Sequence, residues 1–346
     1  MLDVLSGFLV VVIIISLGYA VGRRRLLGTG AVYTLNMFVF FLATPALLIN
    51  VLREADLAAL FGENLAVVVL SSVCAGLVGF LGYRFLARRS VPDSVITMLA
   101  CSYCNGANLG IPITAHVLDD PTAALPVIIF QVAVYGPVSV LILDVSERRR
   151  KAAEESPDSS DRASYGGDAD DGTHRAPGAS LPPILPVVRE LLFGVLRNPL
   201  ILAAIAGITL GALHQWLDIA LPGLLAEPIV LLASAAVPCA LVAFGLSMAE
   251  ITVLDPDSSP RRSVWMAALM KTVGHPLIAF VIATVLFGAS GPALLAFVVV
   301  AALPTAQNVF TYATRYGVNT VLARDTAVIS SLLAIPSITV IAVLLG

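Results

Sequence analysis

Long apolar runs without a single charged side chain constrain this sequence more than any other feature. Each run approaches the roughly 20 residues that a helix needs to cross the hydrocarbon core of a bilayer. The runs are apolar around the whole helix rather than along one stripe, which argues against helices of a soluble core. The charge-free runs are Val4–Gly22, Ala31–Leu52, Asn64–Tyr83, Ser94–Leu118, Pro121–Leu143, Asn198–Leu217, Pro228–Ala249 and Thr326–Gly346.

Two further spans lie between Arg262 and Arg315, where Lys271 is the only charged residue and the turn FGASGP (287–292) divides the segment. The composition agrees, since 58% of the residues are hydrophobic and 12% charged, against about 25% charged in soluble domains. We therefore expect an all-α integral membrane protein with ten transmembrane helices.

The basic residues predict how these spans are oriented. With the N-terminus placed outside, all but two of the 20 lysines and arginines fall in inner loops. The two exceptions are Arg53, in an outer loop, and Lys271, within a span. Because cytoplasmic loops carry an excess of Lys and Arg, we expect a multi-pass plasma-membrane protein with both termini extracellular.

The segment 144–190 interrupts the apolar pattern with charged, small and Pro- and Gly-rich sequence, a composition that cannot bury a core. We interpret it as a cytoplasmic, partly disordered linker, either a passive connector or a regulatory loop. It separates a first five-helix unit, 1–143, from a second, 191–346. Because each unit has an odd number of spans, the two units enter the membrane in opposite orientations.

A weak internal repeat supports this division. Gly18 and Gly211 lie 193 residues apart, as do Pro45 and Pro238, while Pro112 and Pro304 lie 192 apart. The landmarks fall at matching places in spans 1, 2 and 4 of each unit. Two inverted five-helix repeats are a transporter architecture in which discontinuous helices hold the substrate near the midplane.

Polar residues interrupt span 4 and its counterpart, span 9, near their centres. The interruptions are YCNGANLGIP (103–112) and LPTAQNVF (303–310). Proline and glycine favour unwound turns, and the freed backbone groups need partners inside a membrane. Half-helix N-termini that point into such a break favour an anion. The alternative for span 4 alone is a helix-packing motif, Gly106-x-x-x-Gly110, followed by a simple kink at Pro112; the second break in span 9 favours a site.

Three stretches resemble the auxin efflux carrier family, which includes prokaryotic malonate-type carriers and plant PIN-like proteins. They are NGANLGIP in span 4, MKTVGHPLIAF in span 8 and LPTAQNVFTYATRYG in span 9. The resemblance implies a fold akin to sodium/bile-acid symporters and related antiporters, in which spans 4 and 9 cross as an X. It also implies that small organic anions pass the membrane at that crossing. By resemblance, Asn105 and Pro112 belong to the first crossing helix, and Pro304 and Asn308 to the second.

Few other polar residues lie within the spans. Lys271 is interpreted as an anion counter-charge or as a tethered cation that stabilises one conformation, the alternative being a side chain that reaches for the cytoplasmic interface. Gln131 is either a pocket-lining amide or a structural one. The complete set of candidate substrate-binding residues is Asn105, Gly106, Asn108, Pro112, Pro304, Thr305, Gln307, Asn308, Lys271 and Gln131.

These patterns predict a secondary transporter of small organic anions, carboxylates of auxin or malonate type, that works by alternating access. Spans 4 and 9 would move, as in an elevator, against a scaffold of spans 1, 2, 6 and 7, in which Pro45 and Pro238 bend helices near the site. Uniport, H⁺ coupling and Na⁺ coupling stay open, and the alternatives are an anion channel or passive pore, or a sodium-coupled symporter.

No nucleophile, metal cluster or P-loop pattern was found, so we expect no enzyme activity, no cofactor and no metal. The bilayer is the expected surrounding, nucleic acid is not an expected partner, and association into a homodimer stays open.

Overall fold

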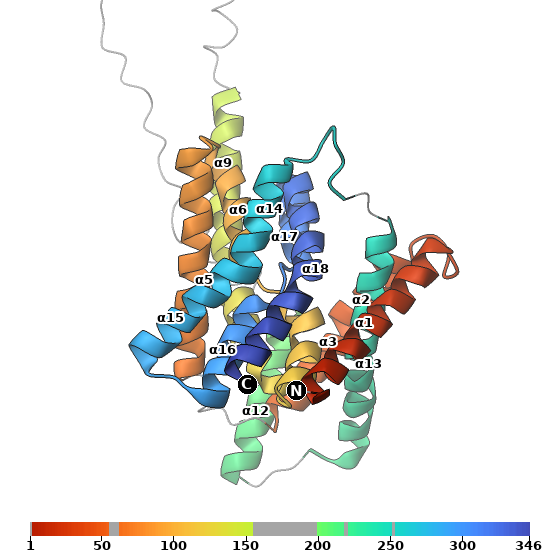
Figure 1. Cartoon of the computed structure of the whole chain (residues 1–346). Coiled ribbons are helices and arrows are strands. Elements are labelled where there is room, and N and C mark those ends of the chain that lie inside the picture. Colours follow the sequence, from red (N-terminus) through yellow and green to blue (C-terminus); the bar gives the residue numbers. More distant parts are fainter. Residues whose placement is uncertain (1, 55–61, 155–198, 218–220, 251–252) are drawn as a thin grey trace, which may run out of the picture.

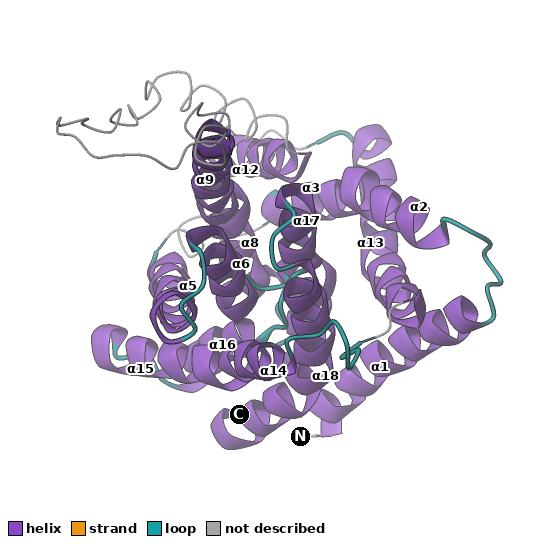
Figure 2. Ribbon diagram, turned by 90° about the horizontal axis from the view of Figure 1, so that it is seen from above, coloured by secondary structure: helices purple, strands orange, loops and turns teal. Residues whose placement is uncertain are grey.

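The computed structural model describes residues 2–54, 62–154, 199–217, 221–250 and 253–346, and these residues are helical with one isolated β-bridge (Figure 1). Most of the expected 144–190 linker lies outside the described residues. Figure 2 shows the same helices from above, with connecting loops and no strand in the described part of the chain.

Seven helical segments among the described residues are long and apolar enough to cross a membrane, which agrees with an integral membrane protein. They are Ala31–Leu52, Glu63–Leu86, Pro121–Glu147, Pro199–Leu217, Gly223–Ala249, Arg261–Phe287 and Thr320–Leu345. Three shorter apolar helices, Val12–Arg23, Val91–Ser102 and Gly291–Ala302, accompany them. That these three shorter helices also cross the membrane, which would make ten spans, therefore stays a prediction.

The first half of the chain forms helices that are interrupted at several points by wider turns. The elements are α1 (Leu2–Arg23), α2 (Ala31–Phe38), η1 (Val39–Ala43), α3 (Thr44–Leu52), α5 (Glu63–Leu81), η2 (Gly82–Leu86), α6 (Val91–Ser102), η3 (Gly106–Gly110), α7 (Ile111–Val117), η4 (Pro121–Ala124), α8 (Leu125–Phe130), η5 (Gln131–Tyr135) and α9 (Gly136–Glu154).

The second half has fewer interruptions. Its elements are α12 (Pro199–Leu217), α13 (Gly223–Glu250), α14 (Arg261–Leu269), η6 (Met270–Gly274), α15 (His275–Phe287), α16 (Gly291–Ala302), α17 (Gln307–Tyr316) and α18 (Thr320–Leu345).

Prolines explain where most of the wider turns occur. The π-helical turns η1, η3, η5 and η6 each end two residues before a proline, and these prolines are Pro45, Pro112, Pro137 and Pro276. A proline has no N–H to donate and its ring crowds the carbonyl of the preceding turn, so a locally wider turn relieves the clash without ending the helix. Pro238, by contrast, lies inside the continuous helix α13.

Glycines let two pairs of helices approach closely. In the pair of α1 and α13, a Cβ atom added at Gly245 would lie 2.1 Å from Ile15 O, and one at Gly18 would lie 2.5 Å from Val242 O. In the pair of α12 and α3, a Cβ at Gly211 would lie 3.0 Å from Leu52 O. Backbones meet at such distances only where side chains are absent, which is how small residues join helices in membranes.

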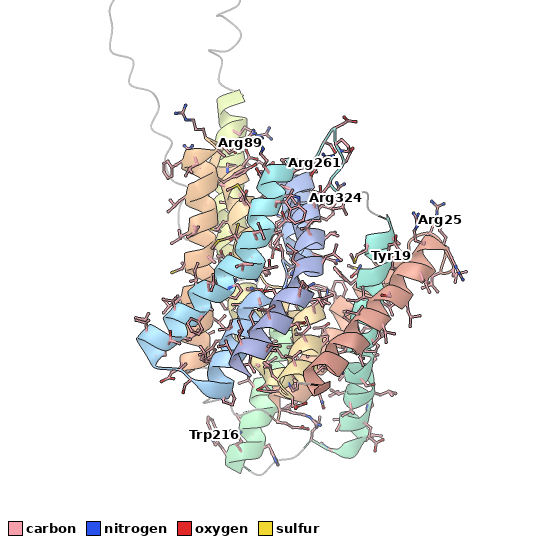
Figure 3. The ribbon with its side chains drawn as sticks, in the orientation of Figure 1. Tyr19, Arg25, Arg89, Trp216, Arg261 and Arg324 are labelled. Atoms are coloured by element: carbon pink, nitrogen blue, oxygen red, sulfur yellow. The ribbon has the colours of Figure 1, made fainter. Side chains whose placement is uncertain are left out.

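The arginines mark one end of the helical bundle. Arg25, Arg89, Arg261 and Arg324 lie toward the same end, and Trp216 lies at the opposite one (Figure 3). The two ends of the chain lie beside each other in both views (Figures 1 and 2). This grouping agrees with the loop assignment made from the sequence, while the side of the membrane that each end faces stays a prediction.

Candidate binding site at the two broken helices

The two interruptions found in the sequence lie side by side in the structure. Between α6 and η3, and between α16 and α17, the chain runs extended and pairs in an antiparallel bridge of Cys104 with Thr305. Asn105 N donates to Pro304 O at 2.7 Å, and Ala306 N donates to Tyr103 O at 3.0 Å. We call the paired segments 103–105 and 304–306 the crossing. The two breaks thus satisfy part of each other's backbone, as a membrane interior requires.

Two of the predicted ligand residues use their side-chain hydrogen bonds to complete this backbone pairing. Thr305 is buried, its hydroxyl donates to Ala100 O at 2.6 Å, and its N–H donates to Ser330 Oγ at 3.0 Å. Gln131 is also buried, and its amide, in the orientation that satisfies both partners, pairs with Cys104 O at 2.8 Å and Cys104 N at 2.7 Å. Both side chains therefore stabilise the crossing.

A cavity of about 690 Å³ lies against the crossing. Its walls come from α2 and η1 on one side, from α13, and from the first turns of α17 and α18. The predicted residues that line it are Asn105, Gly106, Asn108, Gln131, Gln307 and Asn308.

Other predicted residues lie outside this wall. They are Pro112, Pro304, Thr305, Lys271 and the two scaffold prolines, Pro45 and Pro238. The helices expected to form the scaffold reach the cavity through Thr44, next to Pro45, and through Phe244 and Ser247 of α13.

Asn105 carries a hydrogen-bond donor that the protein leaves unused. The residue is 4% exposed, lines the cavity, and its Nδ2 has no hydrogen-bond partner. A buried donor without a partner costs about 1–3 kcal/mol. By comparison, Gln307 Nε2 donates to Ser247 Oγ at 3.2 Å, and Asn36 Nδ2 donates to Val32 O at 2.8 Å within α2. The unused Asn105 donor therefore indicates a place for an acceptor in the cavity.

Two helix starts meet the same cavity. Gly106, Ala107 and Asn108 open the helical segment after the first break, and Gln307 with Asn308 opens α17. The first N–H groups of a helix have no partner within the helix, and they carry the positive end of the helix dipole. Of these groups, Gly106 N–H donates to Cys104 O at 2.8 Å, outside the helix. Two such ends beside a neutral amide donor make a site suited to an anion.

Lys271 lies next to the crossing, and its side chain contacts the C-terminal end of α16. Its side chain is fully buried, and Nζ donates to Ala301 O at 2.6 Å and lies 3.2 Å from His275 Nδ1. Ala301 is the penultimate residue of α16, where unpaired carbonyls concentrate negative partial charge. A cation tethered at the end of a half-helix, one of the two interpretations made from the sequence, would make this contact, and the fully buried side chain does not extend to the aqueous interface.

Sequence reasoning missed one cavity residue that carries charge. Arg324, in the second turn of α18, lines the cavity, although the sequence marked it only as an inner-loop cation. The sequence feature that could have pointed to Arg324 is its place directly before Asp325, at the start of the last span. Tyr103 and Asn36 also line the cavity without having been predicted.

Comparisons with known proteins relate the chain to membrane transport proteins. A family model described as "Membrane transport protein" matches residues 3–342 of the chain. The chain is also 28% identical over 332 residues to a protein of Rhizobium meliloti (strain 1021) named "Putative malonate transporter", a match that covers 94% of this chain and 91% of that protein.

Proposed function

The chain belongs to this family of membrane transport proteins, the auxin efflux carrier family, and on that premise we propose that it is a secondary transporter of small organic anions. The match identifies it as a transporter and not an enzyme. The finer proposal is that carboxylates of malonate or auxin type bind at the crossing and are carried by alternating access.

The unused Asn105 donor carries this proposal. A carboxylate accepts hydrogen bonds and repays the cost of the unpaired N–H. The helix starts at Gly106 and Gln307 add positive partial charge on either side of it. A neutral solute would gain less from this arrangement, and a cation would be repelled by it. The name of the Rhizobium relative favours dicarboxylates such as malonate among the anions.

The way the helices pair supports the proposed inverted repeats and scaffold. Span 1 packs on span 7 through Gly18, and span 6 packs on span 2 through Gly211, and these two glycines are the repeat landmarks. Equivalent partners in the two halves are what an internal two-fold axis produces. We propose ten spans, with spans 1, 2, 6 and 7 as scaffold and the crossing as part of the moving unit.

The cavity lies toward the end of the bundle at which Arg25, Arg89, Arg261 and Arg324 lie. We call it the arginine-bearing end. Gly30 and Tyr33, just after the Arg23–Arg25 loop, line it together with Arg324. Because cytoplasmic loops are rich in arginine, we propose that this conformation is open to the cytoplasm.

The test is flux of labelled malonate and of indole acetate in proteoliposomes that contain the purified full-length protein. We expect saturation and counterflow, because a carrier exposes one site alternately on the two sides. Protein-free liposomes set the leak rate. Linear flux without exchange would indicate a pore and overturn the proposal, and an imposed Na⁺ or H⁺ gradient in the same vesicles identifies any coupling ion.

A further inference from the structure

Arg324 is the one charged residue that lines the cavity among the residues that the structure describes. The remaining polar groups on the wall are amides, hydroxyls and backbone. A cation at the edge of a low-dielectric cavity raises the local concentration of anions and speeds their entry. Among the described arginines at this end of the bundle, Arg324 is therefore the one placed to attract an anion into the cavity.

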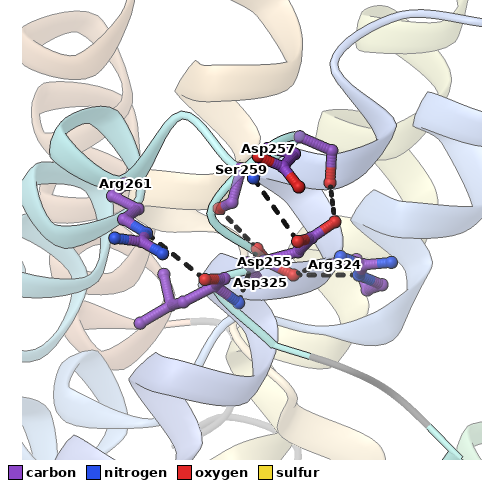
Figure 4. A network of polar contacts seen from close by, with 8 residues as sticks. Asp255, Asp257, Ser259, Arg261, Arg324 and Asp325 are labelled. Atoms are coloured by element: carbon purple, nitrogen blue, oxygen red, sulfur yellow. Dashed lines mark hydrogen bonds and ion pairs between the residues drawn. The ribbon is translucent and has the colours of Figure 1, made fainter.

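The guanidinium is held in place by its neighbour Asp325 (Figure 4). Arg324 Nε and Nη2 lie 2.9 Å and 2.8 Å from Asp325 Oδ1. The Asp325 side chain is 0% exposed, whereas that of Arg324 is 26% exposed. The carboxylate is thus enclosed in protein, while part of the Arg324 side chain stays accessible.

The other carboxylate oxygen anchors this pair to the loop that precedes α14. Asp325 Oδ2 accepts Ser259 Oγ–H at 2.6 Å and Leu254 N–H at 3.1 Å. Four donors saturate the carboxylate, so Asp325 has little capacity left for further partners. Arg324, in contrast, has five N–H donors, and the bonds to Asp325 use only its Nε and Nη2 side.

We propose that Arg324 is the first carboxylate-binding residue on the path from the arginine-bearing end to the crossing, oriented by Asp325. This inference rests on the proposed anion transport. The planar guanidinium suits a carboxylate better than an ammonium would, because it offers two parallel donors. Since Asp325 offsets part of the positive charge, the anion is held weakly enough to move on to Asn105.

If this is correct, a substitution of Arg324 changes the KM for malonate differently at the two faces of the membrane. Arg324→Gln raises the KM for malonate entering from the arginine-bearing end by about 10- to 150-fold, the range expected when a hydrogen bond to a charged group is lost. The KM from the opposite end changes by less than about twofold, because that route does not begin at Arg324. Arg324→Lys keeps the positive charge but loses the paired donors of the guanidinium, and gives a KM between those of the wild type and Arg324→Gln.

The experiment measures malonate uptake at both faces, in inside-out and right-side-out vesicles that contain the full-length protein. Arg261→Gln is the matched control, since Arg261 lies at the same end (Figure 3) and bonds Leu254 O at 3.3 Å but does not line the cavity. This control keeps the wild-type KM. A second control, the double variant Arg324→Gln with Asp325→Asn, removes both charges of the pair and stays defective.

Three results overturn the inference. They are an unchanged KM in Arg324→Gln, an equal rise at both faces, and recovery of the wild-type KM in the double variant, which would reduce Arg324 to a structural counter-ion of Asp325. If Arg324→Gln does not fold, a wild-type KM in Arg324→Lys at the arginine-bearing end would overturn it. Absence of saturable malonate flux in the wild type is a different result, because it contradicts the proposed function itself.

Discussion

Replacing Asn105 by alanine separates a ligand-binding amide from a structural one. Its Nδ2 is buried against the cavity without a partner. Removing it therefore takes no hydrogen bond from the free protein, and it relieves an unsatisfied donor that costs about 1–3 kcal/mol. We expect Asn105→Ala to be as stable as the wild type without substrate, or more stable.

The bound state should show the opposite effect. A hydrogen bond from Asn105 to a carboxylate contributes about 1.5–3 kcal/mol, so its loss weakens binding by about 10- to 150-fold. At a malonate concentration of about 100 times the wild-type Kd, ligand binding stabilises the wild type by about 2.7 kcal/mol. For the variant at that concentration, the same relation gives only about 0.3–1.4 kcal/mol.

The assay is thermal unfolding of the purified protein in detergent, with and without malonate. The control is Asn36→Ala, because Asn36 lines the same cavity but its amide already donates to Val32 O at 2.8 Å. The control should keep the full malonate-induced rise of the unfolding midpoint. A full rise in Asn105→Ala, or a marked loss of stability in the ligand-free variant, would refute the assignment of the unused donor to the substrate.

Two further predictions concern the framework of the site. Gly245→Ala should lower the unfolding midpoint by an amount equivalent to about 1–3 kcal/mol, because its Cβ would lie 2.1 Å from Ile15 O and force α1 away from α13. Gly82→Ala, where nothing lies within 4 Å of the added atom, should leave the midpoint unchanged or raise it, and equal midpoints for the two variants would contradict the argument. Lys271→Met should cost about 1–3 kcal/mol of stability, because Ala301 O loses a charged donor at the end of α16. An unchanged midpoint combined with a raised malonate KM would instead identify Lys271 as a direct counter-charge.

The sequence alone was enough to predict a helical membrane protein and to locate the two polar breaks. The physical reason is that a bilayer requires long apolar helices and penalises every unpaired backbone group, so both the spans and the places where they break are visible in composition. The resemblance of the broken segments to the auxin efflux carrier family is confirmed by the family match over residues 3–342.

Only the tertiary structure decided which polar side chains keep a hydrogen-bond donor free toward the cavity. Thr305 and Gln131 have the chemistry of ligands, yet their partners are Ala100 O, 205 residues away in the sequence, and the backbone of Cys104. Asn105 differs from them because no protein acceptor reaches its Nδ2. Hydrogen-bond partners are set by contacts between distant segments, and a residue's type does not reveal whether its donor is already used.

The charged residues follow the same rule. Lys271 looked like a residue of the site, but its Nζ donates to Ala301 O near the end of α16 and the residue does not line the cavity, whereas Arg324 looked like an ordinary loop cation and lines it. Charge and position in the sequence were enough to group Arg324 with the arginines at one end of the helical bundle. The packing of α18 against its neighbours decided that a buried Asp325 would hold Arg324 at the cavity wall.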